Sequence, residues 1–400
     1  MLSVLFLTEY EHTQIDKRVF SDLNLDLLFP DKTIEILRLP CRSEDIAARQ
    51  EMFRALENES FRKNAEQLRD ALISFSQQKD AAEKAKSECE KLFRFRLLAE
   101  GYLALLGCLA DTKGLPSCTF RDHLSDYAAK KAESAEKLRK ISEEYARITA
   151  EISRFKVRID SKITQVLRPD DADFSVNEKI MYNASALGFS LSPTPCRFEK
   201  QRLTEGFSDV LMRTFPNEFE KLSEQMQKAA VLIDFSVLRL TEELNFYFSV
   251  CDLVSKAAAH NVPHSYPRIA PFAKYAVKAA YDITLLSRNA DIIVPNDIDF
   301  DAADRIYFLT GANGGGKTTY LRTCAVNLVL FLSGCPIFCK EDFRGENEIY
   351  PFRTVFTHFP SDEGYESVGR LEEETERVRQ ITQRMTKDTF AFFNESFGGA

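Results

Sequence analysis

A glycine-rich stretch in the last quarter of the sequence has the residue types and spacing for binding a phosphate group. It runs Gly311-Ala-Asn-Gly-Gly-Gly-Lys-Thr-Thr319 and fits the pattern G-x-x-x-x-G-K-[ST]. Glycines allow positive φ and close approach of the backbone, so consecutive N–H groups can converge on one phosphate. The lysine of this pattern reaches the β- and γ-phosphates, and the next hydroxyl can hold Mg²⁺. The stretch therefore predicts a site for ATP and Mg²⁺.

The residue types within the stretch assign the contacts that a nucleotide would make. Lys317 is the predicted catalytic lysine, and Thr318 is the predicted Mg²⁺ ligand. The predicted nucleotide-binding residues of the stretch are Gly311, Asn313, Gly314, Gly315, Gly316, Lys317, Thr318 and Thr319.

The residues on either side predict the strand–loop–helix context that a phosphate-binding loop needs. Residues 305–310 are a short run of β-branched and aromatic side chains, which predicts a buried strand. Residues 320–332 are apolar and free of Pro and Gly, which predicts a helix whose N-terminus faces the phosphates. A glycine-rich turn before a buried helix is the alternative interpretation.

A second motif lies downstream of the glycine-rich stretch. Residues 389–393 predict a buried strand that ends in Asn394 and Glu395. In phosphoryl-transfer sites, acidic residues at such a strand end organise Mg²⁺ and the attacking water. Glu395 is the predicted catalytic residue that activates water, and Asn394 is the predicted group beside the metal. Because the Asn394 amide carries no charge, we expect weaker organisation of Mg²⁺ and slower hydrolysis without loss of binding. An ordinary buried strand with a polar end is the alternative.

The composition predicts a globular protein without a strong overall charge. Its 400 residues are 44% hydrophobic and 28% charged, with a net charge of −8, so contact with nucleic acid needs a local basic patch or channel. Nine cysteines without a C-x-x-C pair predict reduced thiols and a cytoplasmic protein. The start does not have the pattern of a signal peptide, and the longest apolar stretch, 324–338, is too short and interrupted to span a bilayer. No membrane partner is predicted.

The middle of the sequence is dominated by helical periodicity. Residues 43–92 contain neither Pro nor Gly, and a second helical pattern covers 124–166. The Gly- and Pro-containing residues 99–118 between them predict a folded tip or hinge. We expect two long helices that form an antiparallel coiled-coil arm; a compact helical bundle is the alternative. The predicted apolar seams are Phe61, Ala65, Leu68, Leu72 and Phe75 in the first helix, and Leu138, Ile141, Tyr145, Ile148, Ile152, Phe155 and Ile159 in the second.

Changes in composition predict three segments. Residues 1–42 are an N-terminal packing segment to which no chemistry is assigned. Residues 43–260 are a mostly α core and lever, which includes a further helical stretch from 197 to 259. A linker with prolines and histidines follows, and residues 261–400 alternate strand, loop and helix as an α/β domain does.

Four stretches together resemble the MutS family of DNA mismatch repair ATPases. Residues 311–322, Gly-Ala-Asn-Gly-Gly-Gly-Lys-Thr-Thr-Tyr-Leu-Arg, are similar to the P-loop of that family. Residues 294–300 look like the segment that lies by the adenine, and Ile293 takes the place of an adenine-stacking residue. Residues 356–359 and the Glu-rich 363–374 resemble its Q-loop-like linker and following helix. Residues 46–57 resemble the opening of its core and lever helices.

The resemblance implies an ABC-like P-loop ATPase domain after a helical lever. The function it implies is an ATP-gated dimeric clamp on mismatched or branched DNA, with a homodimer formed through the ATPase domain and ATP and Mg²⁺ as cofactors. DNA binding would depend on DNA structure and not on base sequence. The mismatch-reading domain of the family has no counterpart here, and its signature loop and switch histidine would lie beyond Ala400. We therefore expect a chain truncated after its Walker B strand, which binds ATP but hydrolyses it weakly.

Two other classes of function compete with a DNA clamp. An SMC-type ATPase would place the P-loop before the coiled coil, which is the opposite of the order here. The other class is a coiled-coil interaction module with a degenerate nucleotide-binding domain, acting on recombination intermediates or ribosomes. The uncharged Asn394 favours that class, and a measurement of ATP hydrolysis separates it from the clamp. The sequence assigns no residue to DNA contact.

Overall fold

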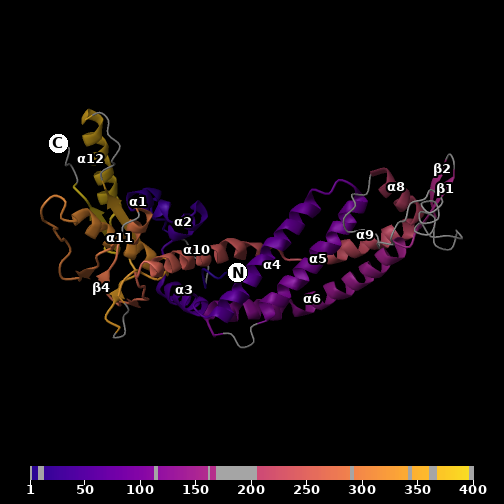
Figure 1. Ribbon diagram of the computed structural model, residues 1–400, viewed down its shortest axis with the longest axis horizontal. Helices are drawn as coiled ribbons and strands as arrows, with labels where there is room; N and C mark the ends of the chain where they lie inside the picture. Colours follow the sequence, from indigo (N-terminus) through magenta and orange to yellow (C-terminus); the bar gives the residue numbers. More distant parts are fainter. Residues whose placement is uncertain are drawn as a thin grey trace. The chain divides into compact units, whose positions relative to one another are not determined.

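Helices account for most of the described chain, and the strands are few and short (Figure 1). The computed structural model describes residues 2–7, 13–111, 116–160, 163–167, 205–288, 292–340, 345–359 and 367–395. The α-helices are α1 (Lys17–Asp22), α2 (Asp31–Leu37), α3 (Ser43–Leu56), α4 (Glu59–Glu83), α5 (Glu88–Ala110), α6 (Thr119–Ile152), α8 (Glu205–Thr214), α9 (Pro216–Ala230), α10 (Leu240–Ala259), α11 (Lys317–Leu332) and α12 (Ser367–Arg384). Short 3₁₀ helices are η1 (Leu25–Leu27), η4 (Phe235–Arg239) and η5 (Ile283–Arg288). The strands are β1 (Lys156–Asp160), β2 (Ile163–Leu167), β3 (Arg268–Ile269), β4 (Tyr275–Ala280), β5 (Asn296–Phe300), β6 (Glu348–Ile349), β7 (Thr354–His358) and β8 (Thr389–Phe393).

These elements belong to two units that are distinguished by their internal contacts. Unit 1 comprises Met1–Ala65, Lys113–His123 and Arg239–Ala400, and unit 2 comprises Glu66–Thr112 and Leu124–Leu238. A helical region together with an α/β region agrees with the predicted fold class at that level. The units follow contacts and not chain order, so the predicted segment boundaries stay a prediction. None of the described helices combines the length and apolar character that a membrane span requires.

Unit 1 contains two small sheets around the buried helix α11. One sheet has the strand order β3-β6-β4-β5, and the other pairs β7 with β8 in parallel. The predicted strand at 389–393 is confirmed as β8, in register with β7 from Thr354↔Thr389 to His358↔Phe393. Its predicted burial is wrong, because only Phe392 is buried and Phe393 is 38% exposed. The predicted helix after the glycine-rich stretch is confirmed as α11, in which every residue from 323 to 332 is buried. Such burial on all sides explains why this helix is apolar throughout.

The predicted buried strand at residues 305–310 is wrong. These residues form no strand, and the side chains of Ile306 and Phe308 are 75% and 88% exposed. A buried strand needs a neighbour that takes its backbone N–H and C=O groups. In the described sheets, β7 pairs only with β8 and β5 pairs only with β4, so residues 305–310 have no ladder partner. β-Branched and aromatic composition alone did not reveal this.

The two predicted apolar seams are largely confirmed as buried faces. All five seam residues of α4 are buried, and in α6 Leu138, Tyr145, Ile148 and Ile152 are buried while Ile141 is half-buried. Helix α6 runs antiparallel to α5, because the Tyr127 hydroxyl lies 3.5 Å from that of Tyr102 while the Tyr145 hydroxyl donates to the Leu92 carbonyl. Figure 1 shows α5 and α6 running side by side. Coiled-coil geometry stays a prediction.

The predicted hinge at 99–118 is largely wrong, because α5 continues to Ala110. Its start is capped by Ser87, whose hydroxyl accepts from the Glu90 N–H at 3.1 Å. Gly101 lies within α5 where a Cβ would collide with the Gln78 side chain of α4, so this glycine serves close helix packing and not a turn. Residues 43–92 consequently form α3, α4 and the beginning of α5 instead of one helix.

The predicted continuation of the second helix to residue 166 is also wrong. Helix α6 ends at Ile152, and β1 and β2 then pair antiparallel from Lys156↔Leu167 to Asp160↔Ile163. The β-branched residues of this stretch recur in alternation as well as at helical spacing, and the strand pattern prevails. Of the predicted helical stretch 197–259, residues 197–204 lie outside the described residues, and α8, α9, η4 and α10 form the remainder.

A fully buried arginine joins three parts of unit 1. Arg49 of α3 donates from Nε to the Leu5 carbonyl and from Nη1 to the Ser333 carbonyl, both at 2.9 Å. Its guanidinium carbon lies 4.6 Å from the ring centre of Phe6, a cation–π distance. Gly334, with a φ of +70°, lies so close to Arg49 that a Cβ would approach the arginine Cβ to 2.7 Å. The C-terminal end of α11 is therefore fixed to α3.

A hydrogen-bonded aspartate has a similar joining role in unit 2. Asp234 accepts from the Tyr127 hydroxyl at 2.9 Å and from the Ser236 hydroxyl at 2.6 Å, and Lys131 Nζ lies 2.8 Å away. Burial raises the pKa of Asp234, but the hydrogen bonds from Lys131, Ser236 and Tyr127 outweigh burial and hold the pKa below its usual value. The carboxylate thus connects α6 to the start of η4.

Replacing Arg49 by methionine should lower the free energy of unfolding by about 2–4 kcal/mol. The substitution leaves two buried carbonyls without donors, while the removal of a buried charge offsets part of that cost. Urea unfolding followed by circular dichroism measures the change. Arg54→Met is the matched control on the exposed side of the same helix and should cost less than about 1 kcal/mol. Equal effects of both substitutions would contradict the role given to Arg49.

Replacing Asp234 by asparagine should weaken the dependence of stability on pH in the acid range. A lowered folded-state pKa stabilises the fold above the unfolded pKa of 3.8, and this contribution is lost as the pH falls through the folded value. We expect Asp234→Asn to cost about 1–2 kcal/mol at pH 7 and progressively less towards pH 3. Urea midpoints between pH 7 and pH 3 measure the difference. A cost that stays constant over that range would disprove the electrostatic explanation.

Candidate nucleotide site

The glycine-rich loop has a backbone that only glycine adopts without strain. Gly314 and Gly316 have φ values of +78° and +83°. At Gly315, an added Cβ would lie 2.9 Å from the Ala312 carbonyl oxygen, which itself accepts from the Gly315 N–H at 3.1 Å. Gly311 and Asn313 complete the loop, and every residue from 311 to 316 is exposed. The loop therefore presents backbone to solvent directly before a helix N-terminus, as an anion site requires.

Lys317 and its neighbours begin helix α11. The Lys317 ammonium group donates to the Gly311 and Ala312 carbonyls, each at 2.9 Å, so the side chain folds over its own loop. Thr319 is half-buried in the first turn, and its carbonyl accepts from the Thr323 hydroxyl at 2.8 Å. The cation and the loop amides consequently lie at the same end of the helix.

The structure brings the two predicted motifs together at one hydrogen bond. The Thr318 hydroxyl donates to Asn394 Oδ1 at 3.1 Å, although 76 residues separate the two in the sequence. Asn394 directly follows β8 and is 6% exposed, and its N–H donates to the His358 carbonyl at 2.8 Å. A hydroxyl and an amide oxygen at this separation can face one Mg²⁺ ion or one of its waters.

Glu395 and Ile293 are less closely tied to the loop. Glu395 is exposed, and its φ of +44° lies in the left-handed region that non-glycine residues rarely adopt. Ile293 is half-buried in the segment before β5, between two exposed apolar residues. A connection between this region and α11 is made by Tyr320, whose hydroxyl donates to the Asp297 carbonyl at 3.1 Å. The catalytic and adenine-stacking roles stay predictions.

A buried polar network behind β7 supports the residues that hold Asn394. Asp22 of α1 accepts from the Thr357 hydroxyl at 2.6 Å and pairs with Arg377 of α12, which also donates to the Thr357 carbonyl at 3.0 Å. Burial raises the pKa of Asp22, against the opposing effects of Thr357 and Arg377. Burial, with a smaller contribution from Arg377, lowers the pKa of His358. This histidine is 2% exposed.

Sequence reasoning missed Asp22 and Arg377. Both residues belong to charged amphipathic stretches, in which one carboxylate or guanidinium looks like any other. Of the predicted Glu-rich helix, the first residues lie outside the described chain and α12 begins at Ser367. The one sequence signal near this network was Thr357, because it lies within residues 356–359, one of the stretches that carry the family resemblance.

The residues of the site fit a magnesium–nucleotide ligand better than a metal bound by protein alone. Within the described chain, no group of three or more His, Cys, Asp or Glu side chains could hold a metal ion. Mg²⁺ in nucleotide sites takes one or two protein oxygens and completes its octahedron with phosphate oxygens and waters. Thr318 and Asn394 supply a donor set of that kind. The glycine loop supplies exposed backbone, with positive φ at Gly314 and Gly316 that other residues rarely adopt.

Comparison with known proteins gives local similarity to one group of relatives. No family model matches the chain. An endonuclease MutS2 of Lactococcus lactis subsp. lactis is 30% identical over 124 residues, which is 30% of this chain and 16% of the relative. Endonuclease MutS2 proteins of Lactococcus lactis subsp. cremoris and of Streptococcus mutans are 29% and 26% identical over 112 and 107 residues, or 14% and 13% of their lengths. The matched stretch is thus less than a fifth of each relative, and it supports a relationship of this chain to the MutS family.

Proposed function

We propose that the chain binds ATP with Mg²⁺ at the glycine-rich loop and acts as a MutS-related, DNA-associated ATPase. The hydrogen bond between Thr318 and Asn394 is the observation that carries this proposal. Two motifs that were recognised separately in the sequence meet there, next to the only cation of the loop, Lys317. A glycine-rich turn without a function would not require a hydrogen bond between Thr318 and Asn394.

Each group has a role in this proposal. The loop amides and the N-terminus of α11 would hold the phosphates, and Lys317 would exchange its bonds to the Gly311 and Ala312 carbonyls for phosphate oxygens. Thr318 and Asn394 would face Mg²⁺, which neutralises charge on the phosphates. Glu395 would orient water. Because Asn394 is neutral, hydrolysis would be slow compared with binding.

The DNA-associated part of the proposal is supported by the relationship to MutS2 proteins. At the finer level we propose an ATP-gated dimeric clamp on branched or mismatched DNA. The long helices α4, α5 and α6 would serve as its lever. Continuous helices of this length transmit displacement with little bending.

A second candidate is an interaction module whose nucleotide-binding domain binds ATP but does not hydrolyse it. The neutral Asn394 and the exposed, strained Glu395 favour it. Its partners would be recombination intermediates or ribosomes. A measurement of ATP hydrolysis distinguishes the two candidates. A clamp driven by hydrolysis must release phosphate from ATP, and this release must disappear when Lys317 is replaced.

Replacing Lys317 by alanine should weaken ATP binding by about 10–100-fold, because a charge-assisted contact to phosphate contributes about 1.5–3 kcal/mol. Isothermal titration with MgATP measures the affinity. Lys387→Ala is the matched control, since this lysine is exposed in the turn before β8, and it should leave the affinity unchanged. Equal affinities of the wild-type chain and Lys317→Ala would refute the nucleotide site.

The same two variants test the association with DNA. Mobility shifts of branched, mismatched and fully paired duplexes are compared with and without ATP. We expect ATP to change the binding of the branched or mismatched DNA by the wild-type chain and by Lys387→Ala, and not by Lys317→Ala. DNA binding that is the same with and without ATP for all three kinds of DNA would contradict the proposed clamp.

Replacing Asn394 by aspartate should reduce the Mg²⁺ concentration needed for half-maximal ATP binding by about tenfold. A carboxylate at 3.1 Å from the Thr318 hydroxyl adds a negative charge that attracts the metal, and tenfold corresponds to about 1.4 kcal/mol. Mg²⁺ titrations at a fixed ATP concentration measure the midpoint. Asn394→Ala is the opposite control and should raise it. The same midpoint in all three proteins would mean that position 394 does not face the metal.

A further inference from the structure

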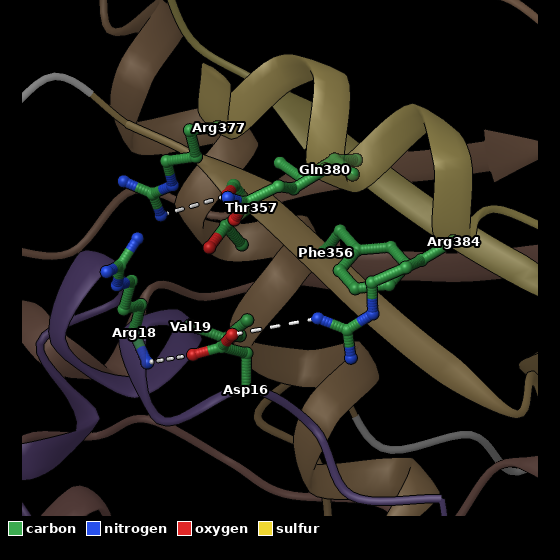
Figure 2. A pocket seen from close by; sticks show the side chains of 9 residues that line it. Asp16, Arg18, Val19, Phe356, Thr357, Arg377, Gln380 and Arg384 are labelled. Atoms are coloured by element: carbon green, nitrogen blue, oxygen red, sulfur yellow. Dashed lines mark hydrogen bonds and ion pairs between the residues drawn. The ribbon is translucent and has the colours of Figure 1, made fainter. Parts of the chain in front are cut away.

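Three arginines line a hollow between α1, β7 and α12, and Figure 2 shows the guanidinium group of Arg384 beside Phe356 and directed to Asp16, apart from those of the other two arginines. Arg18 comes from α1, and Arg377 and Arg384 come from α12. The hollow has about 340 Å³ of free space, part of it open to solvent. None of its lining residues belongs to the glycine-rich loop, so it is separate from the candidate nucleotide site.

The carboxylates nearby do not neutralise these three arginines. Asp22 is only 13% exposed and is already engaged by Arg377 and the Thr357 hydroxyl. Asp16 accepts from the Arg18 backbone N–H at 3.0 Å and thereby caps α1, and it lies 3.9 Å from Arg384, beyond hydrogen-bond distance. Among the described side chains at the hollow, three arginines therefore meet two aspartates, and both aspartates already have other structural roles.

Arg18 is the arginine whose charge is left over. Its guanidinium has no hydrogen bond, ion pair or ring contact among the described residues; only its backbone N–H is bonded. Figure 2 shows the guanidinium ends of Arg18 and Arg377 pointing toward each other. The two positive groups repel each other, whereas an anion placed between them would attract both.

We propose that this hollow binds a small phosphate-bearing anion. Planar guanidinium forks match the oxygens of phosphate in a bidentate manner, and the net positive charge favours a group that carries more than one negative charge. Arg384 is held in place by the Phe356 ring, with its guanidinium carbon 5.1 Å from the ring centre, so little side-chain entropy is lost on binding.

Occupation of the hollow would tighten the attachment of α1 to the sheet that holds Asn394. The ligand would contact arginines from α1 and from α12, and β7 forms the floor between them. It would thus add a connection parallel to the Asp22–Arg377 pair. The site does not depend on the nucleotide function, because neither Lys317 nor Thr318 takes part in it.

Isothermal titration of Lys317→Ala with inorganic phosphate and with glycerol 3-phosphate tests the site. This background weakens phosphate binding at the glycine-rich loop, so the remaining signal reports the hollow. We expect one saturable site at millimolar concentration, and a loss of at least tenfold in affinity when Arg18→Gln is added. Arg18 suits the test because it has no structural bond to break, and unchanged thermal melting confirms that. Arg353→Gln is the matched control, since that side chain is 79% exposed just before β7, and should bind as the background does.

Two results would overturn the proposal. One is the absence of saturable binding of either compound, and the other is equal binding with and without Arg18. Tighter binding of glycerol 3-phosphate identifies an organic phosphate as the ligand class, and tighter binding of inorganic phosphate identifies the free ion; both support the site. Because every titration uses the Lys317→Ala background, a failure of the nucleotide site would leave the phosphate signal unchanged.

Discussion

The C-terminal end of the buried helix α11 imposes a constraint on the whole of unit 1. The last carbonyls of a helix have no partner within it, and burial denies them water. Here the Leu332 carbonyl accepts from the Cys41 N–H at 2.7 Å, and the Ser333 carbonyl accepts from Arg49 at 2.9 Å. The Ser333 hydroxyl in turn donates to the Leu37 carbonyl at 2.9 Å. The N-terminal helices must therefore dock on this end of α11, which leaves its opposite end free to carry an exposed loop.

The free end of α11 keeps its polar groups occupied by bonds that a ligand can replace. Lys317 is bonded to two carbonyls of its own loop, and Thr318 is bonded to Asn394. A nucleotide with its metal would take over these donors and acceptors without unfolding any helix, so little ordering is required on binding. Gly314 and Gly316 allow the loop to keep this conformation, because both have positive φ values that other residues adopt only with strain.

Sequence reasoning correctly predicted the elements that a local sequence pattern determines, and it failed for elements that depend on contacts with a distant segment of the chain. The seam of α4, the helix α11 and the strand β8 follow from periodicity and apolar runs that need no other segment to be recognised. Residues 305–310 have a strand-like composition, yet strand formation needs a neighbour that composition cannot supply. Gly101 looked like a helix breaker, although its role is set by Gln78 of another helix. In the site, the loop was predictable, whereas Asp22 and Arg377 act through contacts between segments more than 300 residues apart.

The N-terminal segment, to which the sequence assigned no chemistry, supports the candidate site from two sides. On one side, the backbone N–H of Cys41 and the carbonyl of Leu37 hold the end of α11, whose beginning carries Lys317. On the other, Asp22 holds Thr357 in β7, and the next residue of that strand gives its carbonyl to the Asn394 N–H. Lys317 and Asn394 lie on different elements, so their separation depends on how these elements are fixed to each other. Because the same N-terminal segment binds both elements, displacement of α1 or α2 would change the distance between the cation of the loop and the group beside the metal. The helical part of unit 1 is thus a component of the candidate site and not only a neighbour of it.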